Sequence, residues 1–129
     1  LQNSKIKKKI ITLIGPTACN KTSTAVHLIK KFPISIIGVD SVQIYKRFNI
    51  GSAKPPKEIL EKYKHHLVDS VDPENIFSVK DFYDQAYRIV IKAHSNNRIP
   101  LLVGGTMMYF NALFKGINNI PEGNEAIRE

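Results

Sequence analysis

The sequence predicts an α/β fold of the P-loop NTPase-like kind, a parallel sheet with helices on both faces. Three short apolar runs, residues 10–14, 34–39 and 99–103, have the β-branched composition of strands buried on both faces. Helical patterns alternate with these runs, which favours right-handed βαβ crossovers. A glycine-containing turn, residues 15–22, joins the first run to the first helical pattern. At 129 residues the chain has the usual size of one domain.

Two helices are predicted from apolar residues at helical spacing. The first covers residues 21–31 and closes on two lysines, whose charges complement a helix C-terminus. The second begins after Ser78, which with Asp81 has the spacing of a capping box, and its apolar stripe runs to about residue 91. Both patterns place one helix face against the sheet.

The remaining elements are shorter. Residues 43–76 are rich in turn signals, and a helix at about 57–63 is the only element expected there. A last helix follows Thr106 and is expected to run through residue 114, with Gly116 as its C-cap.

The carboxyl ends of parallel strands meet at one edge of an open sheet, and ligands bind at that edge. The three expected strands end at residues 15–22, at Asp40 with Ser41, and at residues 104–106. We therefore expect these segments to be neighbours, although they are far apart in the sequence.

The turn at residues 15–22 matches a Walker A pattern at every defined position except the second glycine. Its residues are Gly15, Pro16, Thr17, Ala18, Cys19, Asn20, Lys21 and Thr22. In such a loop backbone N–H groups hold phosphate oxygens, Lys21 adds a full charge, and the Thr22 hydroxyl ligates Mg²⁺. Asn20 replaces the glycine, and since asparagine tolerates a left-handed backbone, we expect the loop to persist at a cost of about 1 kcal/mol.

The polar residues at the other strand ends have two interpretations each. Asp40 either holds Mg²⁺ or accepts a proton from a nucleophile, or else it caps the turn that follows it. Thr106 either reaches a substrate or caps the helix after it. His65 and His66 resemble metal ligands, but adjacent side chains of an extended segment point to opposite faces and no third ligand has suitable spacing. We expect no metal site there.

Composition limits the class of protein. The formal net charge of +8 suits a polyanionic partner, although surface lysines also serve solubility alone. The sole cysteine excludes an internal disulfide, and no apolar run is long enough for a signal peptide or a membrane span. We expect a cytoplasmic protein whose residues 1–8 form a disordered basic tail.

Five blocks of the sequence together resemble one family, the tRNA dimethylallyltransferases, also called tRNA isopentenyltransferases. They are residues 15–22, 40–45 (DSVQIY), 51–55 (GSAKP), 65–69 (HHLVD) and 104–109 (GGTMMY). The resemblance implies transfer of a dimethylallyl group from dimethylallyl diphosphate to N6 of an adenosine beside the anticodon of tRNA. It also implies Mg²⁺ as cofactor and a monomer. Chains of the family are more than twice as long, so residues 1–129 are expected to be the N-terminal part of the core, without its C-terminal half, and to bind tRNA weakly alone.

The same resemblance implies roles for individual residues. Asp40 would be the general base on N6 and Thr106 a second catalytic position, while Lys21 and Thr22 would hold the diphosphate and Mg²⁺. The implied tRNA contacts are Asp40, Ser41, Val42, Gln43, Thr106 and Arg128.

Three other functions remain open at this point. An adenylate isopentenyltransferase would use a free nucleotide in place of tRNA. A P-loop kinase of a small substrate would transfer phosphate from ATP, but no lid of clustered arginines is recognisable. A truncated relative without turnover would only bind phosphate or nucleic acid. The short length and Asn20, in place of the family's usual glycine, favour this interpretation, and Cys19 stands where the family usually has serine.

Overall fold

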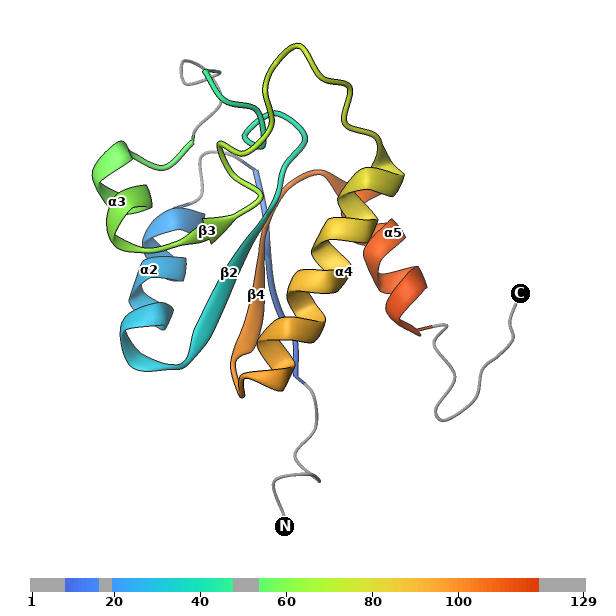
Figure 1. Cartoon of the computed structure of the whole chain (residues 1–129). Coiled ribbons are helices and arrows are strands. Elements are labelled where there is room, and N and C mark those ends of the chain that lie inside the picture. The colour runs from blue at the N-terminus through green and yellow to red at the C-terminus, as the bar shows by residue number, and fades with distance from the viewer. Residues whose placement is uncertain (1–8, 17–19, 48–53, 119–129) are drawn as a thin grey trace.

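A computed structural model describes residues 9–16, 20–47 and 54–118 of the chain (Figure 1). The first half contains β1 (Ile11–Ile14), α2 (Lys21–Lys31), β2 (Ile34–Val39), α3 (Lys57–Lys62) and β3 (His65–His66). The second half contains α4 (Val79–Ser95), β4 (Ile99–Gly104) and α5 (Met107–Asn118). Within the described ranges, no helix is both long and apolar enough to cross a membrane. The tail expected at residues 1–8 lies outside the described residues.

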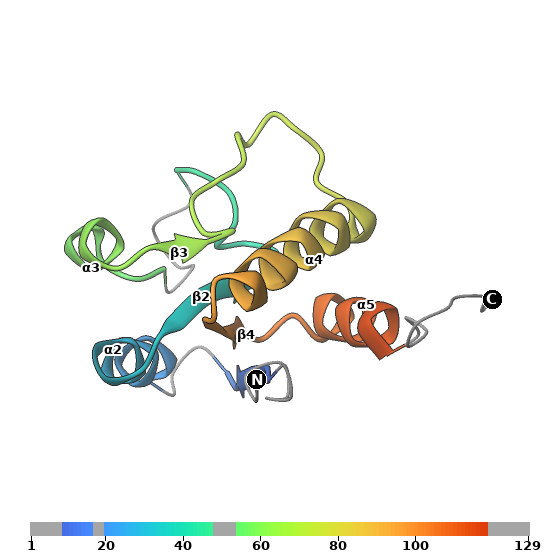
Figure 2. The same cartoon turned by 60° about the horizontal axis from the view of Figure 1, so that its bottom comes forward.

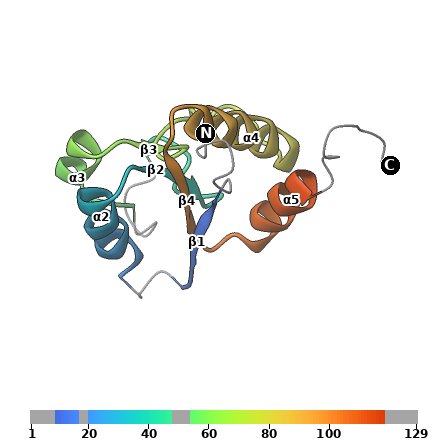
Figure 3. The same ribbon diagram turned by 90° about the horizontal axis from the view of Figure 1, so that it is seen from below.

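The four strands form one parallel sheet in the order β1-β4-β2-β3, which confirms the predicted α/β fold. Ile36 of β2 lies opposite Leu101 of β4 on one side and opposite His65 of β3 on the other. Viewed from below, the sheet runs between α2 and α3 on one side and α4 and α5 on the other (Figure 3). Helices therefore cover both faces, as the sequence predicts.

Alternating side chains of β2 and β4 build one core on each face of the sheet, because successive residues of a strand point in opposite directions. Ile34, Ile36 and Leu101 pack on Ala25 of α2. The larger core, between the sheet and the helices α4 and α5, contains Ile37, Val39, Leu102, Phe82, Ala86, Val90, Phe110 and Leu113. These two cores hold β2 and β4 rigidly, and both strands end at the candidate site.

The capping box predicted for α4 is present. The Ser78 hydroxyl accepts a hydrogen bond from the Asp81 N–H at 3.0 Å, and the Asp81 carboxylate accepts one from the Ser78 N–H at 2.9 Å. From this end α4 lies beside α5 (Figure 2), and the rings of Phe82 and Tyr109 stack with centroids 4.2 Å apart. This stacked pair of rings packs α5 against α4 in the larger core.

Strand β1 differs from the prediction, which had residues 10–14 buried on both faces. Ile11 is 37% exposed and Ile14 is 47% exposed. The reason is that β1 pairs with β4 alone and lies at the edge of the described sheet. An apolar run predicts a strand but not how many neighbours that strand has.

Two further details differ from the prediction. Gly116 lies inside α5 and does not cap it, and a Cβ atom there would come within 2.2 Å of the Tyr83 ring. This glycine therefore allows α5 to approach α4 closely. In addition, His65 and His66 form a strand in the stretch where only a helix was expected, since they pair with the middle of β2.

Candidate active site

A pocket of about 400 Å³ lies at the carboxyl ends of β1, β2 and β4. It is lined by Ile14, Gly15, Pro16, Lys21, Asp40, Ser41, Val42, Gly105, Thr106 and Met107. The predicted convergence of the three segments is confirmed. The Gly15 N–H also donates to the Gly104 carbonyl at 3.3 Å, which fixes the segment after β1 to the end of β4.

Asn20, which stands where the Walker A pattern has its second glycine, has the left-handed backbone expected there. Asn20 has φ 58° and ψ 32°, and its exposed side chain makes no capping hydrogen bond to α2. Asparagine therefore supplies the backbone conformation for which the pattern uses glycine. Thr17, Ala18 and Cys19 lie outside the described residues.

Lys21 and the start of α2 give this end of the pocket a positive potential. The Lys21 ammonium group donates to the carbonyls of Gly15 and Pro16, each at 2.7 Å. The first turn of α2, which includes Thr22, contains no acidic residue. The N–H groups and the dipole of the helix end thus favour an anion.

Asp40 caps the turn after β2. Its Oδ1 atom accepts hydrogen bonds from the N–H groups of Val42 at 2.8 Å and Gln43 at 3.0 Å. Both bonds use the same oxygen, so the turn does not need Oδ2. The carboxylate can therefore fix the turn and still accept a proton in the half-buried pocket.

Thr106 joins the end of β4 to the end of β2. Its hydroxyl accepts a hydrogen bond from the Ser41 N–H at 2.9 Å and lies 3.4 Å from the Ser41 hydroxyl, to which it donates. The first turn of α5 is instead bonded to the Thr106 carbonyl, by the N–H groups of Tyr109 and Phe110. The side chain therefore positions Ser41, a role that sequence reasoning missed.

Gly104 brings the two strands together at the pocket. A Cβ atom at this position would lie 2.0 Å from the carbonyl oxygen of Val39. The close approach allows the Thr106 N–H to donate to the same carbonyl at 3.2 Å. The sequence analysis did not predict this close contact between the two strands.

The histidine pair lies away from this pocket. His65 Nδ1 is 2.8 Å from the Tyr63 carbonyl, and burial lowers the pKa of both His65 and His66 below 6.5. Across the described part of the chain, no group of three potential metal-ligating side chains occurs. Arg128, which the resemblance implies as a tRNA contact, lies outside the described residues.

Comparison with known proteins agrees with this geometry. The model of the IPP transferase family matches residues 43–129. The chain is 45% identical over 119 residues to a tRNA dimethylallyltransferase of Dichelobacter nodosus, which covers 92% of this chain and 37% of the relative. It is also 45% identical to a tRNA dimethylallyltransferase of Legionella pneumophila, with 96% of this chain and 40% of the relative covered.

Solved structures give the same result. The crystal structure of the full-length tRNA isopentenylpyrophosphate transferase of Bacillus halodurans matches with a TM-score of 0.79 and 39% identity, over 95% of this chain and 39% of that one. A eukaryotic dimethylallyltransferase acting on tRNA matches with a TM-score of 0.77 and 31% identity, over 83% and 27% of the two chains. The chain thus spans well under half the length of these relatives. With a family model over most of its residues and the same fold in related enzymes, the chain belongs to the IPP transferase family.

Proposed function

We propose that the protein carrying this chain transfers a dimethylallyl group from dimethylallyl diphosphate to N6 of an adenosine beside the anticodon of tRNA. The observation that supports the proposal is that one pocket contains both the first lysine of α2 and a carboxylate. Lys21 and Asp40 both line this pocket. A prenyl transfer requires both groups, one for the leaving diphosphate and one for the attacking amine.

The chemistry follows from these two groups. As the bond between the allylic carbon and the diphosphate oxygen breaks, negative charge grows on the diphosphate, beside Lys21 and the N-terminus of α2. The adenine N6 forms the new bond to that carbon, and its proton goes to the Asp40 carboxylate. Thr106 holds Ser41, and through it the turn that contains Asp40, in place.

The oxygen donors near the loop suit Mg²⁺, which prefers hard oxygen ligands and keeps several waters. The Thr22 hydroxyl, in the first turn of α2, would hold the ion together with diphosphate oxygens. When bound, Mg²⁺ would neutralise part of the charge that develops on the leaving group.

The net charge of +8 supports tRNA as the partner, because lysine-rich surfaces attract backbone phosphates. We infer that Ser41, Val42, Gln43, Thr106 and Arg128 contact the target nucleotide or its neighbours. Val42 is 47% exposed at the rim of the pocket, which suits such a contact.

The test separates the two roles of Asp40. Asparagine keeps an oxygen that can accept from Val42 and Gln43 but is not a base, whereas alanine loses both functions. We expect Asp40→Asn to fold like the natural protein and to lose about 100-fold or more in single-turnover transfer from labelled dimethylallyl diphosphate to unmodified tRNA. If Asp40→Asn transfers normally and only Asp40→Ala is inactive, Asp40 is a turn residue and not the base.

A further inference from the structure

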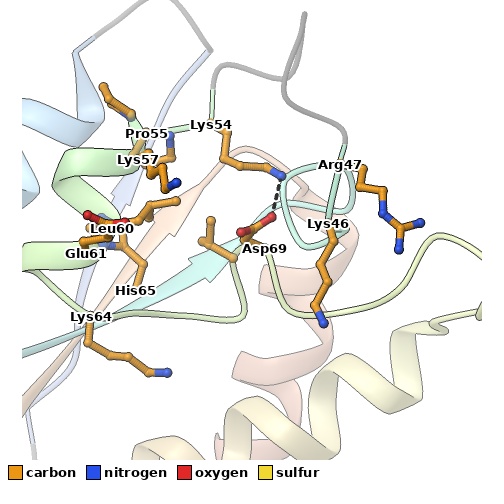
Figure 4. A pocket seen from close by; sticks show the side chains of 12 residues that line it. Lys46, Arg47, Lys54, Pro55, Lys57, Leu60, Glu61, Lys64, His65 and Asp69 are labelled. Carbon is orange, nitrogen blue, oxygen red and sulfur yellow. Dashed lines mark hydrogen bonds and ion pairs between the residues drawn. The ribbon is translucent and has the colours of Figure 1, made fainter.

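Lys54 is a buried lysine next to a second, larger pocket. This pocket, of about 860 Å³, lies between the segment after β2 and the helix α3 (Figure 4). The Lys54 side chain is only 4% exposed, and its ammonium group donates to the Tyr45 carbonyl at 2.8 Å and to Asp69 Oδ1 at 3.0 Å. Figure 4 shows the side chain reaching toward Asp69.

Two other cations of this pocket, Lys46 and Arg47, differ from Lys54. Lys46 lies 3.5 Å from Asp72 and Arg47 lies 3.8 Å from Glu74, and all four of these side chains are at least 47% exposed. Exposed pairs of this kind contribute little to stability. In the Lys54 pair Asp69 is also 47% exposed, but the Lys54 side chain is 4% exposed. A buried ammonium group is costly unless it is paired and hydrogen-bonded, so Lys54 depends on its bonds to Tyr45 and Asp69.

Tyr45 and Asp69, to which Lys54 donates, belong to segments that are bonded to each other. The Asp69 N–H donates to the Gln43 carbonyl at 2.9 Å, the Ser70 N–H donates to the Ile44 carbonyl at 2.7 Å, and Tyr45 and Val71 form an isolated bridge. Residues 69–71 therefore hold the far end of the segment that begins at Asp40. Lys54 bonds to both sides of this junction.

The junction contains unfavourable backbone conformations. Leu67 has φ 62° and Asp69 has φ 55°, both in the left-handed region that non-glycine residues rarely adopt. Such conformations persist only where the surroundings determine them. The bond from Lys54 to the Asp69 side chain is one of the contacts that does so.

We propose that Lys54 is a positioning residue of the candidate active site. Through Tyr45 and Asp69 it fixes residues 40–45 as a unit, so that Asp40 keeps its orientation toward the pocket at the strand ends. This inference rests on the proposed transferase function. Lys54 is not among the described residues that line the pocket at the ends of β1, β2 and β4, so we expect its effect on transfer to be indirect.

The experiment compares Lys54→Met and Asp69→Asn in the natural gene product that carries this chain. Lys80→Met is the matched control, since Lys80 forms an ion pair of the same length, 3.0 Å to Asp84, on the exposed side of α4. Three quantities are measured: the single-turnover transfer rate, the dissociation constant of dimethylallyl diphosphate, and the melting temperature.

We expect Lys54→Met to reduce the transfer rate by roughly 10- to 100-fold, the loss that a displaced catalytic group produces, with less than about a twofold change in diphosphate affinity. Asp69→Asn should reduce the transfer rate less, because its amide oxygen still accepts a hydrogen bond from Lys54. Lys80→Met should leave the transfer rate unchanged. A transfer rate that is unchanged in folded Lys54→Met would overturn the inference. So would equal losses of transfer and of diphosphate affinity, which indicate general unfolding.

A second measurement distinguishes failure of the proposed transferase function from failure of the positioning role of Lys54. If the natural protein transfers no label, amide hydrogen exchange still tests the positioning role. The N–H groups of Val42, Gln43 and Ser70 should then exchange about tenfold faster in Lys54→Met than in Lys80→Met. Equal exchange in the two variants would refute the role of Lys54 without reference to catalysis.

Discussion

Replacing Thr106 with valine tests whether its hydroxyl organises the active site. Valine keeps the branched shape but removes the acceptor of the Ser41 N–H, a bond of 2.9 Å. Leaving a buried donor unsatisfied costs about 1–3 kcal/mol, and the lower end applies because Ser41 is only half-buried. About 1 kcal/mol corresponds to a loss of roughly fivefold in the population of the active arrangement.

Thr106→Ser is the matched control, because it keeps the hydroxyl and removes only a methyl group. We expect Thr106→Val to lose roughly fivefold or more in single-turnover transfer, and Thr106→Ser to stay within about twofold of the natural protein. Thermal unfolding of each variant, measured in parallel, shows how much of the loss is general destabilisation. If the serine variant loses as much transfer as the valine variant, the methyl group matters and the hydrogen bond to Ser41 does not.

Three further predictions concern the stability of the fold. Asn20→Ala should lower the free energy of unfolding by about 1 kcal/mol relative to Asn20→Gly, because alanine tolerates the left-handed backbone least, and equal urea midpoints would contradict this. Gly104→Ala should lower the free energy of unfolding by about 3 kcal/mol or more, because the new Cβ would lie 2.0 Å from a backbone oxygen. Gly105→Ala, whose Cβ would lie 3.1 Å from the nearest atom, should lower it much less in the same denaturation assay. Burial lowers the pKa of His65, so the unfolded chain binds more protons and the free energy of unfolding falls as the pH drops below about 6.5. His65→Gln should make this dependence of stability on pH less steep, and an unchanged dependence would exclude His65 as its source.

The elements of this fold follow from local patterns. The strands β2 and β4 and the helices α2 and α4 lie where the apolar spacing and caps place them, because each buries a face large enough to leave a periodic signal. Strand β3 has only two residues and is defined by its pairing with β2, so no local sequence pattern predicts it. Gly116 likewise has a role that no local pattern predicts. It leaves room inside α5 for the ring of Tyr83, a residue of α4.

The candidate site was predictable to a different extent. Parallel topology alone brought the phosphate loop, Asp40 and Thr106 to one edge. The partners of the side chains were not predictable, because the bond from Thr106 to Ser41 spans 65 residues and that from Lys54 to Asp69 spans 15. The sequence blocks that contain Lys54 and Asp69 were recognised as part of the resemblance, but only the structure connects them physically.

The geometry at Asn20 and Lys21 agrees with the proposed diphosphate binding by residues 15–22, although Asn20 departs from the Walker A pattern. The backbone at Asn20 is left-handed, as the missing glycine would allow, and its side chain is exposed and bonds to no N–H group of the helix start. Lys21 donates to the carbonyls of Gly15 and Pro16, each at 2.7 Å. Because an ammonium group has three donors, Lys21 can turn one or more of them to a phosphate oxygen and still hold the loop. The left-handed backbone at position 20 and the charge of Lys21 are therefore both present without glycine at position 20.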